Sequence, residues 1–110
     1  MFGINEIDSC TLKTWRESGK SFRLIDVRSH SEISQGMIEN GEPMPLNLIP
    51  IKASELDTDH EIIFYCRSGA RSAQACAYLM QNGFEKVYNL RGGIMDWVRG
   101  GNQVVAPASI

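Results

Sequence analysis

The chain has 110 residues and a mass near 12.3 kDa, which allows one domain and leaves no room for a second. Hydrophobic residues make up 43% of it and charged residues 22%, as in a folded globular protein rather than a disordered one. The net charge of −2, from 11 Lys and Arg against 13 Asp and Glu, provides no strong basic field for nucleic acid phosphates.

The first quarter of the chain predicts a strand, a helix and a second strand. Residues 4–8 are a short extended stretch, and residues 9–17 form a helix capped by Asp8 or Ser9. Residues 22–27 are mostly apolar without clear alternation, which is typical of a strand buried on both faces.

The next quarter is less regular. Residues 29–35 are polar and predict one helical turn. Residues 39–45 contain one glycine and two prolines and therefore predict a loop. We expect a short apolar strand over 46–49, ended by Pro50, and a helical turn over 52–56.

The second half of the chain has the clearest periodicity. Its longest helix has apolar residues at i, i+3, i+4 and i+7, which is one helical face. The predicted elements are a strand over 61–65, a helix from Arg71 or Ser72 to about Asn82, a strand over 86–90, a helix over 94–99 and a tail over 100–110.

Strands that alternate with helices predict an α/β fold, with a parallel-rich sheet covered by helices on both faces. We expect residues 1–110 to form one domain with its core at about 4–99. No apolar run approaches the roughly 20 residues of a membrane helix, and the N-terminus lacks the features of a secretory signal. We therefore expect a cytoplasmic protein.

The three cysteines are an odd number, which argues against a disulfide framework, and their spacing with the two histidines suggests no metal site. Cys76 falls on the apolar helical face and is expected in the core. Cys10 lies at a helix start, where it can be exposed.

One segment carries the residue types of a reactive site. The strand over 61–65 leads directly into Cys66 and a seven-residue stretch, CRSGARS, that opens the next helix. Ligands of open α/β sheets bind at the carboxyl ends of strands, and the free N–H groups of a helix start favour negative charge. The free N–H groups and the dipole of the helix start both lower the pKa of a thiol there, so we predict Cys66 to be a nucleophilic thiolate rather than a structural cysteine.

The residues after Cys66 suit an anion held against that thiolate. The small residues Ser68, Gly69 and Ala70 allow the chain to wrap back with its amides pointing inward, as in an anion-binding nest. Arg67 and Arg71 add positive charge to the same loop.

The two arginines have different expected roles. Arg67 is predicted to face the pocket rim and attract an anionic donor, with a solvated loop arginine as the alternative. Arg71 is predicted to pair with Asp26 or Glu32 and brace the loop, with substrate contact as the alternative. Asp26, Arg28 and Glu32 are accordingly interpreted as structural support for the site.

Four stretches in register resemble the rhodanese-like sulfurtransferases. The resemblance runs from about Ile4 to Val105, and it implies the fold of that family, a parallel-rich five-stranded sheet with helices on both faces. The stretches are LIDVR at 24–28, Glu32 with GMI at 36–38 (family E-x-x-x-G-H-I), CRSGARS at 66–72 (family C-x-x-G-x-R-S) and LRGGI at 90–94 followed by Trp97 (family L-x-G-G-x-x-x-W).

The resemblance implies that the Cys66 thiolate takes the outer sulfur of a donor such as thiosulfate and becomes a persulfide. A thiol, cyanide or the cysteine of a sulfur-carrier protein then accepts that sulfur, as in two-step nucleophilic catalysis. The amides of residues 67–72 are expected to stabilise the sulfur, and the Ser72 hydroxyl can reach it. No metal or organic cofactor is implied, and no nucleic acid or membrane partner is expected.

Two alternatives remain open. Phosphatases and arsenate reductases on the same scaffold carry C-x5-R in a longer loop, whereas Cys66 and Arg71 are spaced as C-x4-R. No general acid for a phosphoester leaving group is evident. The other alternative is a non-catalytic rhodanese-like binding module, although such modules commonly lack the cysteine that this chain keeps.

The chain departs from the family in one region. Met37 stands where the family usually has histidine, and the segment that follows is longer and carries Glu39 and Glu42. If this acidic loop (residues 39–45) reached the pocket rim, it would repel small anions such as thiosulfate and could steer a basic partner protein.

Overall fold

The computed structural model describes residues 3–107, which form one five-stranded sheet in the order β1-β5-β4-β2-β3. Every neighbouring pair of strands is parallel, so the predicted parallel-rich α/β fold is confirmed. The central strand β4 is buried along its whole length. The strands are β1 (Asn5–Ile7), β2 (Arg23–Asp26), β3 (Glu42–Pro43), β4 (Ile62–Tyr65) and β5 (Val87–Leu90).

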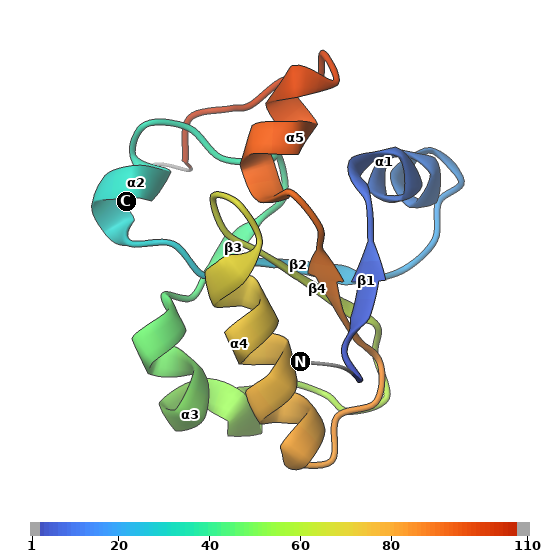
Figure 1. Ribbon diagram of the computed structural model, residues 1–110, viewed down its shortest axis with the longest axis vertical. Coiled ribbons are helices and arrows are strands. Elements are labelled where there is room, and N and C mark those ends of the chain that lie inside the picture. The colour runs from blue at the N-terminus through green and yellow to red at the C-terminus, as the bar shows by residue number, and fades with distance from the viewer. Residues whose placement is uncertain (1–2, 108–110) are drawn as a thin grey trace.

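Helices cover both faces of the sheet (Figure 1). α3 and α4 pack on one face, and α1 and α5 pack on the other, each pair over its own buried apolar cluster. Within residues 3–107, no helix has the length and apolar character needed to cross a membrane. The helices are α1 (Ser9–Glu17), α2 (His30–Ile33), α3 (Ile49–Lys52), α4 (Ala70–Gln81) and α5 (Gly93–Arg99), with short 3-10 turns η1 (Leu46–Leu48) and η2 (Ala53–Glu55).

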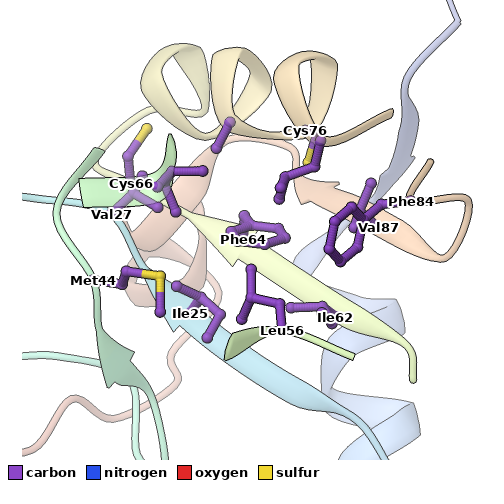
Figure 2. Close-up of a cluster of buried hydrophobic side chains, with 13 residues drawn as sticks. Ile25, Val27, Met44, Leu56, Ile62, Phe64, Cys66, Cys76, Phe84 and Val87 are labelled. Atoms are coloured by element: carbon purple, nitrogen blue, oxygen red, sulfur yellow. The ribbon is translucent and has the colours of Figure 1, made fainter. Parts of the chain in front are cut away.

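The two-residue period of β4 decides which way Cys66 faces. Phe64 and Cys66 belong to the cluster beneath α4, whereas Ile63 and Tyr65 belong to the cluster beneath α1 and α5. Figure 2 shows Phe64 in the middle of the first cluster and Cys66 at one end of it. β4 thus places Cys66 on the face of the sheet that α4 covers.

The strand predicted over 46–49 is wrong. This segment forms η1 and the start of α3, and Pro50 occupies a first-turn position of α3, where the missing N–H of proline costs nothing. The outer strand is instead β3, inside the segment predicted to be a loop. A proline is tolerated in β3 because this strand lies at the edge of the sheet.

The described part of the segment predicted as a tail, residues 100–107, contains no helix or strand but contacts the rest of the protein. Val105 pairs with Met37 in an antiparallel bridge through two backbone hydrogen bonds of 2.8 Å. The indole N–H of Trp97 donates to the carbonyl of Gln103 at 2.9 Å. These contacts hold the segment against the body of the protein, and residues 108–110 of the prediction lie outside the described part.

The other predicted elements are confirmed to within a few residues. Asp8 caps α1 by accepting from the N–H of Thr11 at 2.8 Å, as expected from the sequence. α4 begins one residue earlier than predicted, because Gly69 rather than Ala70 precedes its first turn. Residues 29–35 contain α2, and the helical turn predicted over 52–56 corresponds to η2.

Candidate active site

Cys66 lies between the end of β4 and the N-terminus of α4, with only 1% of its surface exposed. Its sulfur accepts a hydrogen bond from the backbone N–H of Gly69 at 3.1 Å and lies 3.5 Å from the Ser72 hydroxyl. Gly69 has φ +107°, a left-handed conformation that favours glycine. This turn bends the backbone so that its amides point back at the sulfur.

The surroundings lower the pKa of the Cys66 thiol. Burial by itself raises that pKa, but hydrogen bonds from the Ser72 hydroxyl and from the N–H groups of Ser72, Gly69 and Ser68 outweigh it. The predicted inward amides are therefore present at three positions. A thiol of this kind forms a thiolate more readily than an ordinary cysteine, and the thiolate is the nucleophilic form.

Asn89 on β5 forms hydrogen bonds with the residues that follow Cys66, and its place in the site was not predicted from the sequence. It is 1% exposed, and its amide donates to the carbonyl of Gly69 at 3.2 Å. Its carbonyl oxygen accepts a short hydrogen bond from the Ser72 hydroxyl. One signal was available in the sequence, a lone polar residue near the carboxyl end of an otherwise apolar buried strand.

The N-terminus of α5 donates hydrogen bonds to backbone carbonyls of the same loop. The backbone N–H of Ile94 donates to the carbonyl of Cys66 at 3.0 Å, and that of Met95 donates to the carbonyl of Arg67 at 3.1 Å. Gly93 packs so closely that a Cβ there would lie 2.5 Å from both carbonyl oxygens. Steric crowding thus explains why residues 92–93 are glycines, which was not predicted from the sequence.

Arg71 braces the loop, as predicted, and its partner is Glu32. The two side chains form a two-point ion pair with distances of 2.7 and 2.8 Å. Ser29 and Glu32 form a capping box at the start of α2, which fixes the carboxylate. The bonds from Arg71 and Ser29 outweigh burial and lower the pKa of Glu32 to about 2.

Asp26 pairs with Arg28 rather than with Arg71. The Arg28 guanidinium donates to both carboxylate oxygens of Asp26 and to the carbonyl of Gly36 at 2.7 Å. Burial disfavours the charge of Arg28, but the bond and charge of Asp26 outweigh it and raise the pKa of Arg28. This buried pair joins the end of β2 to the segment after α2.

A cavity of about 560 Å³ opens beside the loop. Arg67 lines it, as predicted, and no ion pair of Arg67 occurs within residues 3–107. One wall is apolar and comes from α5 and from the returning C-terminal segment, which sequence reasoning did not assign to the site. The lining residues are Arg28, Glu32, Gln35, Gly36, Arg67, Ile94, Met95, Val98, Arg99 and Val104.

The acidic loop does not reach this cavity. Glu42 forms a two-point ion pair with Arg23 at the opposite end of β2, and Glu39 lines a separate cavity beside α1. The expected repulsion of small anions by these carboxylates is therefore not supported. The charged residues that line the cavity next to Arg67 are three arginines, Arg67 included, and one glutamate.

The structure also places the remaining residues that were discussed from the sequence. Ala70 is the first residue of α4 and makes no polar side-chain contact. Cys76 is fully buried, and burial raises its pKa to about 12, while Cys10 is exposed, both as predicted. Among residues 3–107, no group of three or more His, Cys, Asp or Glu side chains is placed to bind a metal ion.

Comparison with known proteins places the chain in a family. Residues 11–99 match the model of the rhodanese-like domain. A sulfurtransferase of Allochromatium vinosum is 51% identical over 104 residues, which is 94% of this chain and 97% of that protein. The Bacillus subtilis protein YtwF is 43% identical over 94 residues, which is 86% of this chain and 90% of that protein.

A comparison with solved structures agrees with the family match. The crystal structure of a rhodanese-like domain protein from Staphylococcus aureus superposes with a TM-score of 0.85 and 26% identity, over 96% of this chain and 100% of that one. The family match and the sulfurtransferase relative support sulfur transfer as the general activity. The resemblance read from the four sequence stretches is confirmed, and the chain belongs to the rhodanese-like domain family.

Proposed function

We propose that this protein is a sulfurtransferase that carries sulfane sulfur as a persulfide on Cys66. The observation that supports the proposal most directly is the ring of donors around the sulfur, from Ser68, Gly69 and Ser72, which lowers the pKa of the thiol. A thiolate and a persulfide are both anionic forms of sulfur, and the backbone N–H groups placed around Cys66 can stabilise that negative charge.

In the first half-reaction, the Cys66 thiolate attacks the outer sulfur of a donor such as thiosulfate. A sulfur–sulfur bond forms at Cys66, the bond between sulfane sulfur and sulfite breaks, and sulfite leaves with its electron pair. Charge is conserved, because a thiolate and thiosulfate become a persulfide anion and sulfite. Arg67 at the cavity attracts the anionic donor.

In the second half-reaction, an acceptor takes the outer sulfur and Cys66 leaves as a thiolate. The acceptor is a low-molecular-weight thiol, cyanide or the cysteine of a sulfur-carrier protein. The open apolar wall of the cavity, with Val98 half exposed, leaves room for an acceptor larger than cyanide. The chemistry uses no metal or organic cofactor, and we propose the cytoplasm, where thiols stay reduced, as its compartment.

The test is intact-protein mass before and after incubation with thiosulfate. We expect the native chain to gain one sulfur atom and to lose it on addition of a thiol or cyanide. Cys66→Ser should gain none, whereas Cys10→Ser, which removes the exposed cysteine, should load like the native chain. Failure to load from thiosulfate, a polysulfide and a low-molecular-weight persulfide alike would contradict the proposal.

A further inference from the structure

The Ser72 hydroxyl lies between two acceptors. Its oxygen is 3.5 Å from the sulfur of Cys66 and closer to the carbonyl oxygen of Asn89, with which it makes a short hydrogen bond. Ser72 is fully buried, so water cannot replace either the Cys66 sulfur or the Asn89 oxygen as the partner of its hydroxyl. A hydroxyl has a single proton and can donate it fully to one acceptor at a time.

The orientation of the Asn89 amide is determined by its other contacts. Its NH2 group donates to the carboxylate of Glu6 at 3.0 Å and to the carbonyl of Gly69 at 3.2 Å. Both amide protons are used in this way, so the carbonyl oxygen must face Ser72. Asn89 therefore acts toward Ser72 as an acceptor and cannot donate to it.

We propose that Asn89 is a positioning residue that competes with the sulfur of Cys66 for the Ser72 proton, so that the hydroxyl turns between them during the reaction. When Cys66 is a thiolate, its charge makes it the stronger acceptor and Ser72 donates to the sulfur. When the sulfur is neutral, Ser72 donates to Asn89. The buried hydroxyl keeps a partner in both states.

This switch rests on the proposed persulfide chemistry, because the position of the negative charge in each state decides which acceptor Ser72 bonds. In the persulfide, the Cys66 sulfur is bonded to the outer sulfur and the negative charge resides on that outer atom. Ser72 then turns to Asn89. When the acceptor removes the outer sulfur, the charge returns to Cys66 and Ser72 turns back to stabilise it. Asn89 thus favours the loaded state, and the Cys66 bond favours the unloaded state.

Several charged groups lie around Cys66 and Asn89, and one of them, Glu6, contacts Asn89 directly. Arg71 interacts electrostatically with Cys66 and is held in place by Glu32, and Glu6 on β1 accepts a hydrogen bond from Asn89. Because Asn89→Ala also removes the donors to Glu6 and to the carbonyl of Gly69, the Ser72→Ala background is needed to trace a change in the titration of Cys66 to the hydroxyl. The remaining charged side chains near the loop are Asp26 and Arg28 at the end of β2 and Arg67 at the cavity.

The primary test is the rate of iodoacetamide alkylation at Cys66 as a function of pH, measured in a Cys10→Ser background. Asn89→Ala frees the Ser72 proton for the sulfur, and we expect the midpoint to fall by about half to one pH unit, the size of one net hydrogen bond. Ser72→Ala removes the donor and should raise the midpoint by a similar amount.

The double variant separates competition from loosening of the loop. In a Ser72→Ala background, Asn89→Ala should leave the midpoint where Ser72→Ala put it, because no proton remains to be shared. Asn82→Ala is the matched control: its amide donates to the carbonyl of Tyr78 at the other end of α4, and it should not move the midpoint. If Asn89→Ala fails to fold, Asn89→Ser replaces it with a side chain too short to reach Ser72.

A second readout follows the loaded state. At a pH above the midpoint, where unloaded Cys66 is a thiolate, and at a fixed ratio of thiosulfate to sulfite, Asn89→Ala should lower the ratio of persulfide to unloaded thiolate several-fold. An unchanged or raised alkylation midpoint, or an equal fall in the Ser72→Ala background, would overturn the switch. If the native chain loads from no donor while the midpoints shift as expected, the competition for the proton stands and the proposed function fails.

Discussion

At the scale of single residues, two arginines of the site are held in ion pairs with carboxylates, so their role is structural rather than reactive. Arg71 lies in the loop after Cys66 and Arg28 lines the cavity beside that loop, but each donates to a carboxylate, Glu32 for the first and Asp26 for the second. Arginine suits this role because its planar guanidinium matches a carboxylate at two points. Of the loop arginines, only Arg67 is left to meet an anion at the cavity among the described residues.

The Glu32–Arg71 pair predicts a pH-dependent contribution to stability. The folded-state pKa of Glu32 is about 2, below its ordinary value of 4.5, so its ionised form stabilises the fold above pH 4.5. That contribution is lost as the pH falls toward 2. We expect Glu32→Gln to lower the free energy of unfolding by about 1 kcal/mol at pH 7, and the difference from the native chain to shrink at pH 2.5, as measured by urea denaturation.

Glu42→Gln is the matched control for this prediction. Glu42 also forms a two-point pair with an arginine, at distances of 2.6 and 3.1 Å, but at the end of β2 away from Cys66. Both variants should lose stability, and only Glu32→Gln should slow sulfur transfer several-fold, because it frees Arg71 next to the loop. Equal transfer rates in the two variants would show that the bracing does not matter.

At the scale of secondary structure, the site is made by two helix starts that meet at one loop. The N-terminus of α4 directs N–H groups at the sulfur, and the N-terminus of α5 directs N–H groups at the carbonyls of Cys66 and Arg67. The loop therefore has its N–H groups facing the sulfur and its carbonyls facing α5. This arrangement requires α5 to approach without a side chain at Gly93.

Gly93→Ala is expected to damage both the fold and the site. Gly93 has φ +59°, and a Cβ there would overlap two backbone oxygens that cannot move independently of Cys66. We expect a loss of about 3 kcal/mol in the free energy of unfolding, together with a rise in the alkylation midpoint of Cys66. Denaturation and alkylation of the same preparation test both effects.

Gly83→Ala isolates the cost of the backbone conformation. Gly83 follows α4, has φ +93° and has open space where a Cβ would lie. Its replacement should cost about 1 kcal/mol and leave the titration of Cys66 unchanged. If Gly93→Ala were no more harmful than Gly83→Ala, the close approach of α5 would not be what holds the loop.

At the scale of the whole molecule, the returning C-terminal segment closes one side of the cavity. Val104 lines the cavity and packs against Gly36, where an added Cβ would lie 3.2 Å from its side chain. Val105 holds the segment in place through its bridge to the buried residue Met37. Two stretches far apart in the chain therefore form one wall.

Val105→Pro should destabilise the protein by removing the N–H that donates to the carbonyl of Met37. Leaving a buried carbonyl unpaired costs about 1–3 kcal/mol, and thermal denaturation measures it. Ala106→Pro is the control, because the N–H of Ala106 makes no backbone hydrogen bond within residues 3–107. Equal melting temperatures for the two variants would rule out a stabilising role for the bridge.

The sequence alone determined the α/β fold, the position of Cys66 and the inward-facing loop. These features depend on local chemistry: a buried strand, small residues and a helix start follow one another within about a dozen positions. The bracing of Arg71 was also predictable as a role, because arginine in such a loop favours a carboxylate. Its partner was predicted only as one of two carboxylates, because their distances depend on how β2 and α2 pack.

Only the tertiary structure decided the contacts between distant segments. Asn89 reaches Ser72 because β5 lies beside β4 under the start of α4, and Gly93 meets Cys66 because α5 packs at the same edge. Residues 42–43 form a strand and 46–49 do not, because β2 offers an edge to the first segment and the prolines suit a helix start in the second. Local sequence carries no information about which remote backbone satisfies a given N–H or carbonyl.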